Sequence, residues 1–261
     1  MREPCLFCPN PSGSREHLWP AWIHELLDVG PIRFQLGNAP SKILKNAELK
    51  VGTVCDGCNQ GWMSALESEN IPHMKPMILG SPLELNEDQQ RLVAAWGVKT
   101  AMVSESMKGR KAPNRFYEKA ECIALKESRT IPSNTLIWIG RVDEFNHLWD
   151  AGTDFTLLEP DGSRLATASV ATFVAGHFVI QILTVHPVAG HVGQIQVPCK
   201  LGNWNDMLIP IWPIQQSTVS WPPKVSFTNG PPLGIAHLHD RWRVGEKVAM
   251  VTKDGVVKKL S

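Results

Sequence analysis

The longest run of apolar residues at helical spacing covers residues 86 to 107. Asn86 is a favoured N-cap residue, and Glu87 and Asp88 follow it in the first turn, where negative charge is favourable. The apolar positions after them recur with the repeat of one helix face. They are Leu92, Val93, Trp96, Ala101, Val103 and Met107. The pattern predicts one long helix with a buried face.

Two shorter helices are predicted nearer the N-terminus. The stretch "WPAWIHELLDVG" has Pro20 near its start, apolar residues at helical spacing and Gly30 as a stop signal. After Asn59, "QGWMSALESEN" carries a second helical pattern, and Pro72 is expected to end that helix. Between these helices, "AELKVGTVC" is typical of a strand that leads into a cysteine pair.

From about residue 131 the pattern changes to short β-rich runs. They are "TLIWIGRV", "ATFVAGHFVIQIL", "GQIQV" and "MLIPIWPI", separated by Gly, Pro, Asn and Asp, which is typical of a sheet or sandwich. The closing stretch "RWRVGEKVAMVTKDGVVKKL" places "KDG" between two valine-rich runs and so predicts a terminal hairpin.

Composition and charge restrict the possible functions only weakly. The 261 residues are 43% hydrophobic and 20% charged, as in a globular protein with a real core. The net charge of +1 gives no overall signature of a nucleic-acid binder, although a local patch would suffice. Two basic segments, "KGRKAPNR" at 108–115 and the C-terminal hairpin, are either solvated or suited to contact a phosphate backbone.

The N-terminal stretch "MREPCLFC" has no apolar region of a signal peptide, and no apolar run reaches the roughly eighteen residues of a membrane span. We therefore predict a cytoplasmic protein without a membrane partner. In that compartment, paired cysteines indicate a metal site more often than disulfides.

Four of the six cysteines form two C-x2-C pairs, Cys5 with Cys8 and Cys55 with Cys58, separated by residues 9–54. Two such knuckles can surround one tetrahedral zinc ion, each sulfur at roughly 2.3 Å. Because four thiolates leave no open position, the zinc is expected to be structural. The alternatives are four unrelated buried cysteines or a redox pair, and the second lacks its usual strand-to-helix context.

Between the knuckles, "REHLWP" places Glu16 directly before His17. Adjacent residues of a strand point to opposite faces, so Glu16 is suited to hold a divalent cation while His17, as a neutral imidazole, activates a water molecule. The amide oxygen of Asn59 is expected to face the same cation. The alternative is that Glu16 and His17 brace the knuckle and that Asn59 is only a helix N-cap.

The motif "CLFC…REHLWP…VCDGCN" resembles the zinc-stapled HNH, or ββα-metal, nucleases over about residues 1–70. The resemblance implies Glu16 and Asn59 as ligands of Mg²⁺ or a similar ion. It also implies His17 as the general base and hydrolysis of a phosphodiester in nucleic acid, most simply DNA. The sequence departs from the family at Lys50, where a middle asparagine is expected, and at Met63, where some members have a further histidine ligand. Glu67, further along the same helix, is a possible additional ligand.

The expected fold class is α+β, with three parts. Residues 1–72 form a treble-clef or ββα-metal zinc module, 73–130 a helical connector, and 131–261 a β-rich domain for recognition or assembly, through which a protein partner or a second copy could bind. The alternative function is a catalytically inactive zinc module that recognises nucleic acid or a protein partner. The remaining cysteines, Cys122 and Cys199, are expected in the core. The histidines of the β-rich part, His177, His186 and His191, are expected as core or surface residues rather than ligands.

Overall fold

The fold is α+β, with a sheet-rich C-terminal region, as the hydrophobic pattern predicts. The computed structural model describes residues 3–28, 32–34, 42–44, 49–108, 115–143, 148–159, 161–191, 195–200, 202–228, 238, 240–242, 249–251 and 257–259. In these ranges no helix is both long and apolar enough to cross a bilayer.

The N-terminal region is built on a very short pair of strands. Strand β1 (Glu16–His17) pairs antiparallel with β4 (Lys50–Val51), so Glu16 lies opposite Val51 and His17 opposite Lys50. The chain between them carries helix α1 (Ala21–Leu27) and an antiparallel hairpin of β2 (Ile32–Phe34) and β3 (Lys42–Leu44). This long excursion separates the two strands in sequence but not in space.

A nearly continuous helical segment follows the second cysteine pair. It consists of α2 (Asp56–Cys58), a π-helical turn η1 (Asn59–Met63) and α3 (Ser64–Ile78). The prediction that Pro72 ends this helix is wrong, because α3 continues through Pro72 and Pro76. The missing N–H groups are tolerated because the burial of Met74, Met77 and Ile78 holds the later turns against the core.

The long helix is confirmed as α4 (Glu87–Glu105), followed by the short turn η2 (Ser106–Lys108). Asn86 caps it as predicted: its side chain accepts the N–H of Gln89, and the Gln89 side chain accepts the N–H of Asn86. Helix α5 (Lys119–Ser128) then precedes the sheet region.

The main sheet has five antiparallel strands in the order β11-β6-β9-β8-β7. They are β6 (Thr135–Arg141), β7 (Leu148–Leu158), β8 (Arg164–Ala175), β9 (Phe178–Pro187) and β11 (Leu208–Trp212). Strand β5 (Leu83–Asn86) pairs separately with β12 (Thr218–Trp221).

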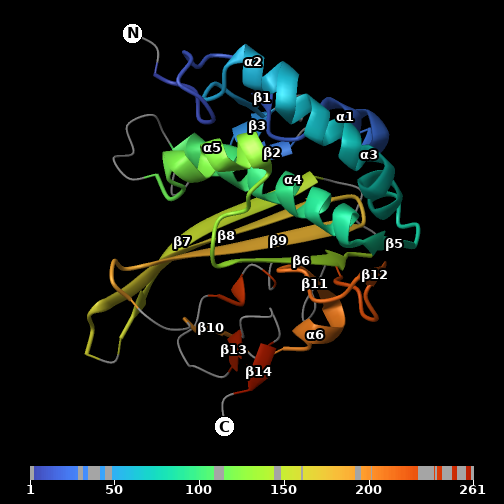
Figure 1. The fold of residues 1–261 in the computed structure, drawn as a ribbon. Coiled ribbons are helices and arrows are strands. Elements are labelled where there is room, and N and C mark those ends of the chain that lie inside the picture. Colours follow the sequence, from blue (N-terminus) through green and yellow to red (C-terminus); the bar gives the residue numbers. More distant parts are fainter. Residues whose placement is uncertain are drawn as a thin grey trace.

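The remaining C-terminal elements lie on the side of the main sheet opposite helices α1 to α5 (Figure 1). They are β10 (Val197–Cys199), helix α6 (Trp204–Met207), β13 (Ala249–Val251) and β14 (Val257–Lys259). Strands β13 and β14 pair antiparallel, which confirms the predicted terminal hairpin, while its "KDG" turn lies outside the described residues.

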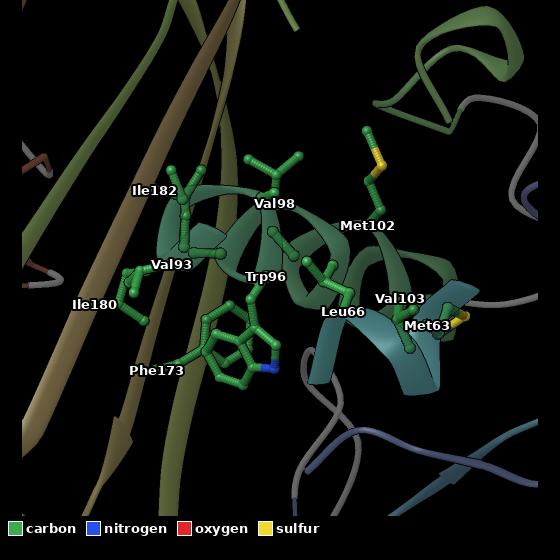
Figure 2. Packing of buried hydrophobic residues seen from close by; sticks show 14 of the residues in the cluster. Met63, Leu66, Val93, Trp96, Val98, Met102, Val103, Phe173, Ile180 and Ile182 are labelled. Atoms are coloured by element: carbon green, nitrogen blue, oxygen red, sulfur yellow. The ribbon is translucent and has the colours of Figure 1, made fainter. Parts of the chain in front are cut away.

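Helix α4 lies between the cysteine-bearing region and the sheet (Figure 1). Figure 2 shows it with Met63 and Leu66 on one side and Phe173, Ile180 and Ile182 of the sheet on the other. One hydrophobic cluster therefore includes the four cysteines of the two pairs, helices α3 and α4 and one face of the sheet. Trp19 joins it by ring contacts to Trp96, at 6.4 Å between centroids, and to Phe173, at 5.8 Å.

The end of α3 is fixed to the sheet at the turn between β8 and β9. The N–H of His177 donates to the carbonyl oxygen of Ile78, the last residue of α3, at 3.0 Å. Gly176 before it has a φ of 53°, and a Cβ atom there would clash with the same carbonyl oxygen. Only glycine satisfies both conditions, so this turn sets the distance between α3 and the sheet.

We predict that Gly176→Ala lowers the free energy of unfolding by about 3 kcal/mol, since it adds a backbone clash to left-handed strain. The matched control is Gly162→Ala, because Gly162 also has a positive φ, 85°, but has open space around its Cβ position. The control should cost only about 1 kcal/mol in urea denaturation. Equal losses in the two variants would show that the contact with α3 contributes nothing.

Candidate metal centre

The two cysteine pairs meet in one buried cluster. Cys5, Cys8, Cys55 and Cys58 are all buried, and their sulfur atoms lie within 4.8 Å of one another. None forms a disulfide. Four sulfurs at this separation can hold a tetrahedral metal ion such as zinc, and no position remains for a substrate.

Backbone N–H groups point at the sulfurs, as they do in metal knuckles. Cys5 Sγ accepts the N–H of Phe7 at 3.4 Å and that of Cys55 at 3.2 Å, and Cys55 Sγ accepts the N–H of Cys58 at 3.4 Å. Burial raises the pKa of the Cys58 thiol. Burial acts in the same direction on Cys55, but the hydrogen bonds to its sulfur outweigh it and lower its pKa. Such donors favour the thiolates that a metal requires.

A lysine from a distant helix supports the first knuckle. Lys119, the first residue of α5, donates its ammonium to the carbonyl oxygens of Cys5, Leu6 and Cys8, the last two at 3.0 Å. These bonds fix the backbone that presents Cys5 and Cys8. They also bring a positive charge toward a centre that carries two net negative charges when four thiolates bind one zinc ion.

The cluster also supports the strands and helix beside it. The two-residue pairing of β1 with β4 is too short to be stable alone. The N–H of Ser14 bonds the carbonyl of Val54 at 2.9 Å, so the approach to β1 is tied to the second knuckle. Cys55 caps the helix that follows, and Phe7 of the first knuckle packs edge-on against Trp62 of that helix, at 4.9 Å between centroids.

Burial alternates along the extended segment that enters β1, so its residues face in two directions. Ser12, Ser14 and Glu16 are buried, whereas Arg15 is exposed and His17 half-buried. Glu16 and His17 therefore lie on opposite faces of β1, as the sequence predicts. Glu16 faces inward, toward helices α3 and α4, and His17 faces outward.

The carboxylate of Glu16 faces a lysine that the sequence reasoning did not identify. Lys99 of α4 is only 1% exposed, and its Nζ lies 2.8 Å from Glu67 Oε1 and 3.9 Å from Glu16 Oε1. Burial raises the pKa of Glu16 to about 7, because desolvation, reinforced by the charge of Glu67, outweighs the opposing effect of Lys99. Glu67 and Glu16 are thus both neighbours of the same ammonium, that of Lys99.

Asn59 lies against the inner face of the same segment. Its side-chain nitrogen donates to the hydroxyl of Ser14 at 3.4 Å, two residues before Glu16. Its backbone is helical and Cys55 caps the helix, so the alternative that Asn59 is the N-cap is wrong. Because Ser14 and Glu16 are both buried on the same side of the segment, the Asn59 side chain lies on the side that carries Glu16.

The outer face places two cations near His17. Lys50, which stands where the HNH pattern has an asparagine, is directly across the strand pair from His17. Side chains opposite each other in an antiparallel pair are close neighbours. Arg15, two residues before His17, shares its face and is exposed.

A signal for Lys99 was present in the sequence. It is the one charged residue in "LVAAWGVKTAMV", an otherwise apolar helical stretch, and a charge there requires a buried partner. Lys119 offered no comparable signal, because its three carbonyl partners belong to a loop more than a hundred residues away in sequence.

The other candidate residues take structural positions. Cys122 and Cys199 are buried, as predicted. His177 donates to the carbonyl of Val142 at 2.7 Å, and His186 pairs with Glu121 at 2.9 Å. Of "KGRKAPNR", residues 109–114 lie outside the described part of the chain, as do the side chains of the C-terminal hairpin.

A surface pocket of about 550 Å³ lies apart from the predicted site residues. It opens where α3, the start of α4, the end of α5 and β11 meet. Its lining includes Arg91, whose guanidinium lies over the ring of Trp212, and the ion pair of Arg129 with Glu69.

Comparison with known proteins yields no match to any family model, curated protein or solved structure.

We predict that Lys119→Met weakens zinc binding roughly tenfold, because three knuckle carbonyls lose their donor and the centre loses a nearby positive charge. The measurement is competition for zinc with a chromophoric chelator. Lys126→Met, in the last turn of the same helix, is the matched control and should bind as the wild type does. Equal affinities for the two variants would contradict a supporting role for Lys119.

Proposed function

We propose that this protein is a metal-dependent endonuclease of the HNH type that hydrolyses phosphodiester bonds in nucleic acid, most simply DNA. One observation carries the proposal. The four-cysteine cluster joins the strand with Glu16 and His17 to the helix with Asn59. Two paired strands followed by a helix, all held by cysteine knuckles, are the parts of a treble-clef or ββα-metal module.

The inner face fits a hard divalent ion such as Mg²⁺. The carboxylate of Glu16 is almost buried and, among the described residues, receives no hydrogen bond, so its oxygens have unused capacity. Glu16 and the amide oxygen of Asn59 would hold the ion, because carboxylate and amide oxygens are the donors that Mg²⁺ accepts. The bound ion would supply charge stabilisation for the leaving oxygen.

The outer face fits the remaining roles. His17 would accept a proton from the attacking water, since imidazole is a competent base near neutral pH. Arg15 and Lys50 would orient the phosphate by charge. Because Glu16 and His17 face apart, the reacting phosphate would lie at the end of β1, where the strand pair is only two residues long.

A second candidate is a catalytically inactive zinc module that binds nucleic acid or a protein partner. The ammonium of Lys99 favours it, because it already places a positive charge beside Glu16 and Glu67, where the nuclease would need a cation. Lys50 in place of the middle asparagine favours it as well. The two candidates share the zinc centre and differ in whether the protein cleaves nucleic acid.

We predict that His17→Ala abolishes Mg²⁺- or Mn²⁺-dependent nicking of supercoiled plasmid, because the general base is lost. The variant should keep its bound zinc and its melting temperature, since His17 is half-buried on the outer face. His73→Ala, which removes a histidine of α3 that has no role in the proposed site, is the matched control and should cleave normally.

Full cleavage by His17→Ala would exclude His17 as the base. The absence of cleavage by the wild-type protein on single- and double-stranded DNA and RNA, with zinc bound, would favour the inactive module.

A further inference from the structure

The ammonium of Lys99 is in an unusual environment for a lysine. It lies in the middle of α4, is 1% exposed and approaches two carboxylates from different parts of the chain. Glu67 comes from α3 and Glu16 from β1. Lys99 is thus the charge around which three separate elements meet.

The hydrogen bonds of this group are incomplete. An ammonium has three donors, and among the described residues Lys99 makes one hydrogen bond, to Glu67 at 2.8 Å. Glu16 Oε1 is too distant, at 3.9 Å, to accept a second. The Glu16 carboxylate, 6% exposed, faces the cluster without a donor from the described residues. A buried carboxylate with open lone pairs beside a second carboxylate is the arrangement that binds a cation.

We propose that Glu16 and Glu67 together form a divalent-cation site. The ammonium of Lys99 competes with the ion for these two carboxylates. The ammonium offsets part of the charge of the two carboxylates when no ion is bound. Glu67 is then a further ligand of the ion, and Lys99 sets how tightly the ion binds. The proposal rests on the function proposed above for the placement of an ion at Glu16, and it adds Glu67 and Lys99 to that site.

The physical reason is the charge balance of a buried site. When both carboxylates are ionised, which for Glu16 requires a pH above its raised pKa of about 7, they and the ammonium carry one net negative charge. That charge attracts a divalent ion weakly, while the ammonium repels it. Removal of the ammonium leaves two buried carboxylates that repel each other and lack a counter-charge, which is costly. A divalent ion then replaces the lost charge, so it should bind more tightly and stabilise the fold.

The test compares full-length, zinc-loaded variants in Mn²⁺ titrations, with free Mn²⁺ followed by electron paramagnetic resonance and stability followed by thermal melting. Lys99→Met should bind Mn²⁺ at least tenfold more tightly than the wild type. It should melt at a lower temperature without Mn²⁺ and recover when Mn²⁺ is added. Lys99→Arg keeps the charge and should bind as the wild type does. Lys75→Met removes a lysine of α3 outside the cluster and should change neither property.

Two further variants keep the outcome decisive. Lys99→Gln retains a donor for Glu67 without the charge, and it serves in place of Lys99→Met if that variant does not fold. Glu67→Gln combined with the neutral Lys99 substitution should lose the gain in affinity, because the added ligand is gone.

Unchanged or weaker Mn²⁺ binding by both neutral variants would overturn the proposal. This result is distinct from a failure of the proposed nuclease function, which would appear as absent cleavage by the wild-type protein. Tighter binding without any cleavage would support the cation site and reject the nuclease.

Discussion

The N-terminal region depends on the closing of four buried sulfurs around one centre. Cys5 and Cys8 are separated from Cys55 and Cys58 by a long excursion, and the strand pair within it spans only two residues on each side. Such a pair is too short to hold its own register. A metal ion bound at the cluster would fix both ends of the excursion, and Lys119 adds three bonds to the first knuckle from outside it. The placement of Glu16, His17 and Asn59 follows from that closure.

Helix α4 connects this centre with the sheet. Its residues from Val93 to Val103 are buried, because the cysteine-bearing region covers one side and the sheet the other. A charged residue at such a position needs a partner, and Lys99 finds Glu67 and Glu16. The same contact that joins the helix to β1 also neutralises the carboxylate proposed to bind a metal. If the proposed cation site is right, the stability of this region and the affinity of the site for the ion both depend on one ammonium.

Sequence reasoning was strongest where the signal is local. The capping pattern at Asn86 located α4, the C-x2-C spacing located the four-sulfur cluster, and "KDG" located the terminal hairpin. It failed at Pro72, because the burial of α3 against the core outweighs one proline, a tertiary effect that no local pattern contains. The contact of Lys119 with the first knuckle and the approach of Glu67 and Glu16 to Lys99 depend on which helices lie beside the knuckles. The sequence does not specify that packing.

The central claim is that the sulfur cluster holds a structural ion and presents Glu16 to a second, separate ion. Anomalous diffraction from crystals of zinc-loaded protein soaked in MnCl₂, recorded at the zinc and manganese edges, tests it directly. The account predicts zinc among the sulfurs of Cys5, Cys8, Cys55 and Cys58 and manganese at the carboxylate of Glu16. Zinc at the cluster with no manganese beside Glu16 would contradict the catalytic half of the account. The absence of metal from the cluster would contradict the first half of the claim, that the four cysteines hold a structural ion.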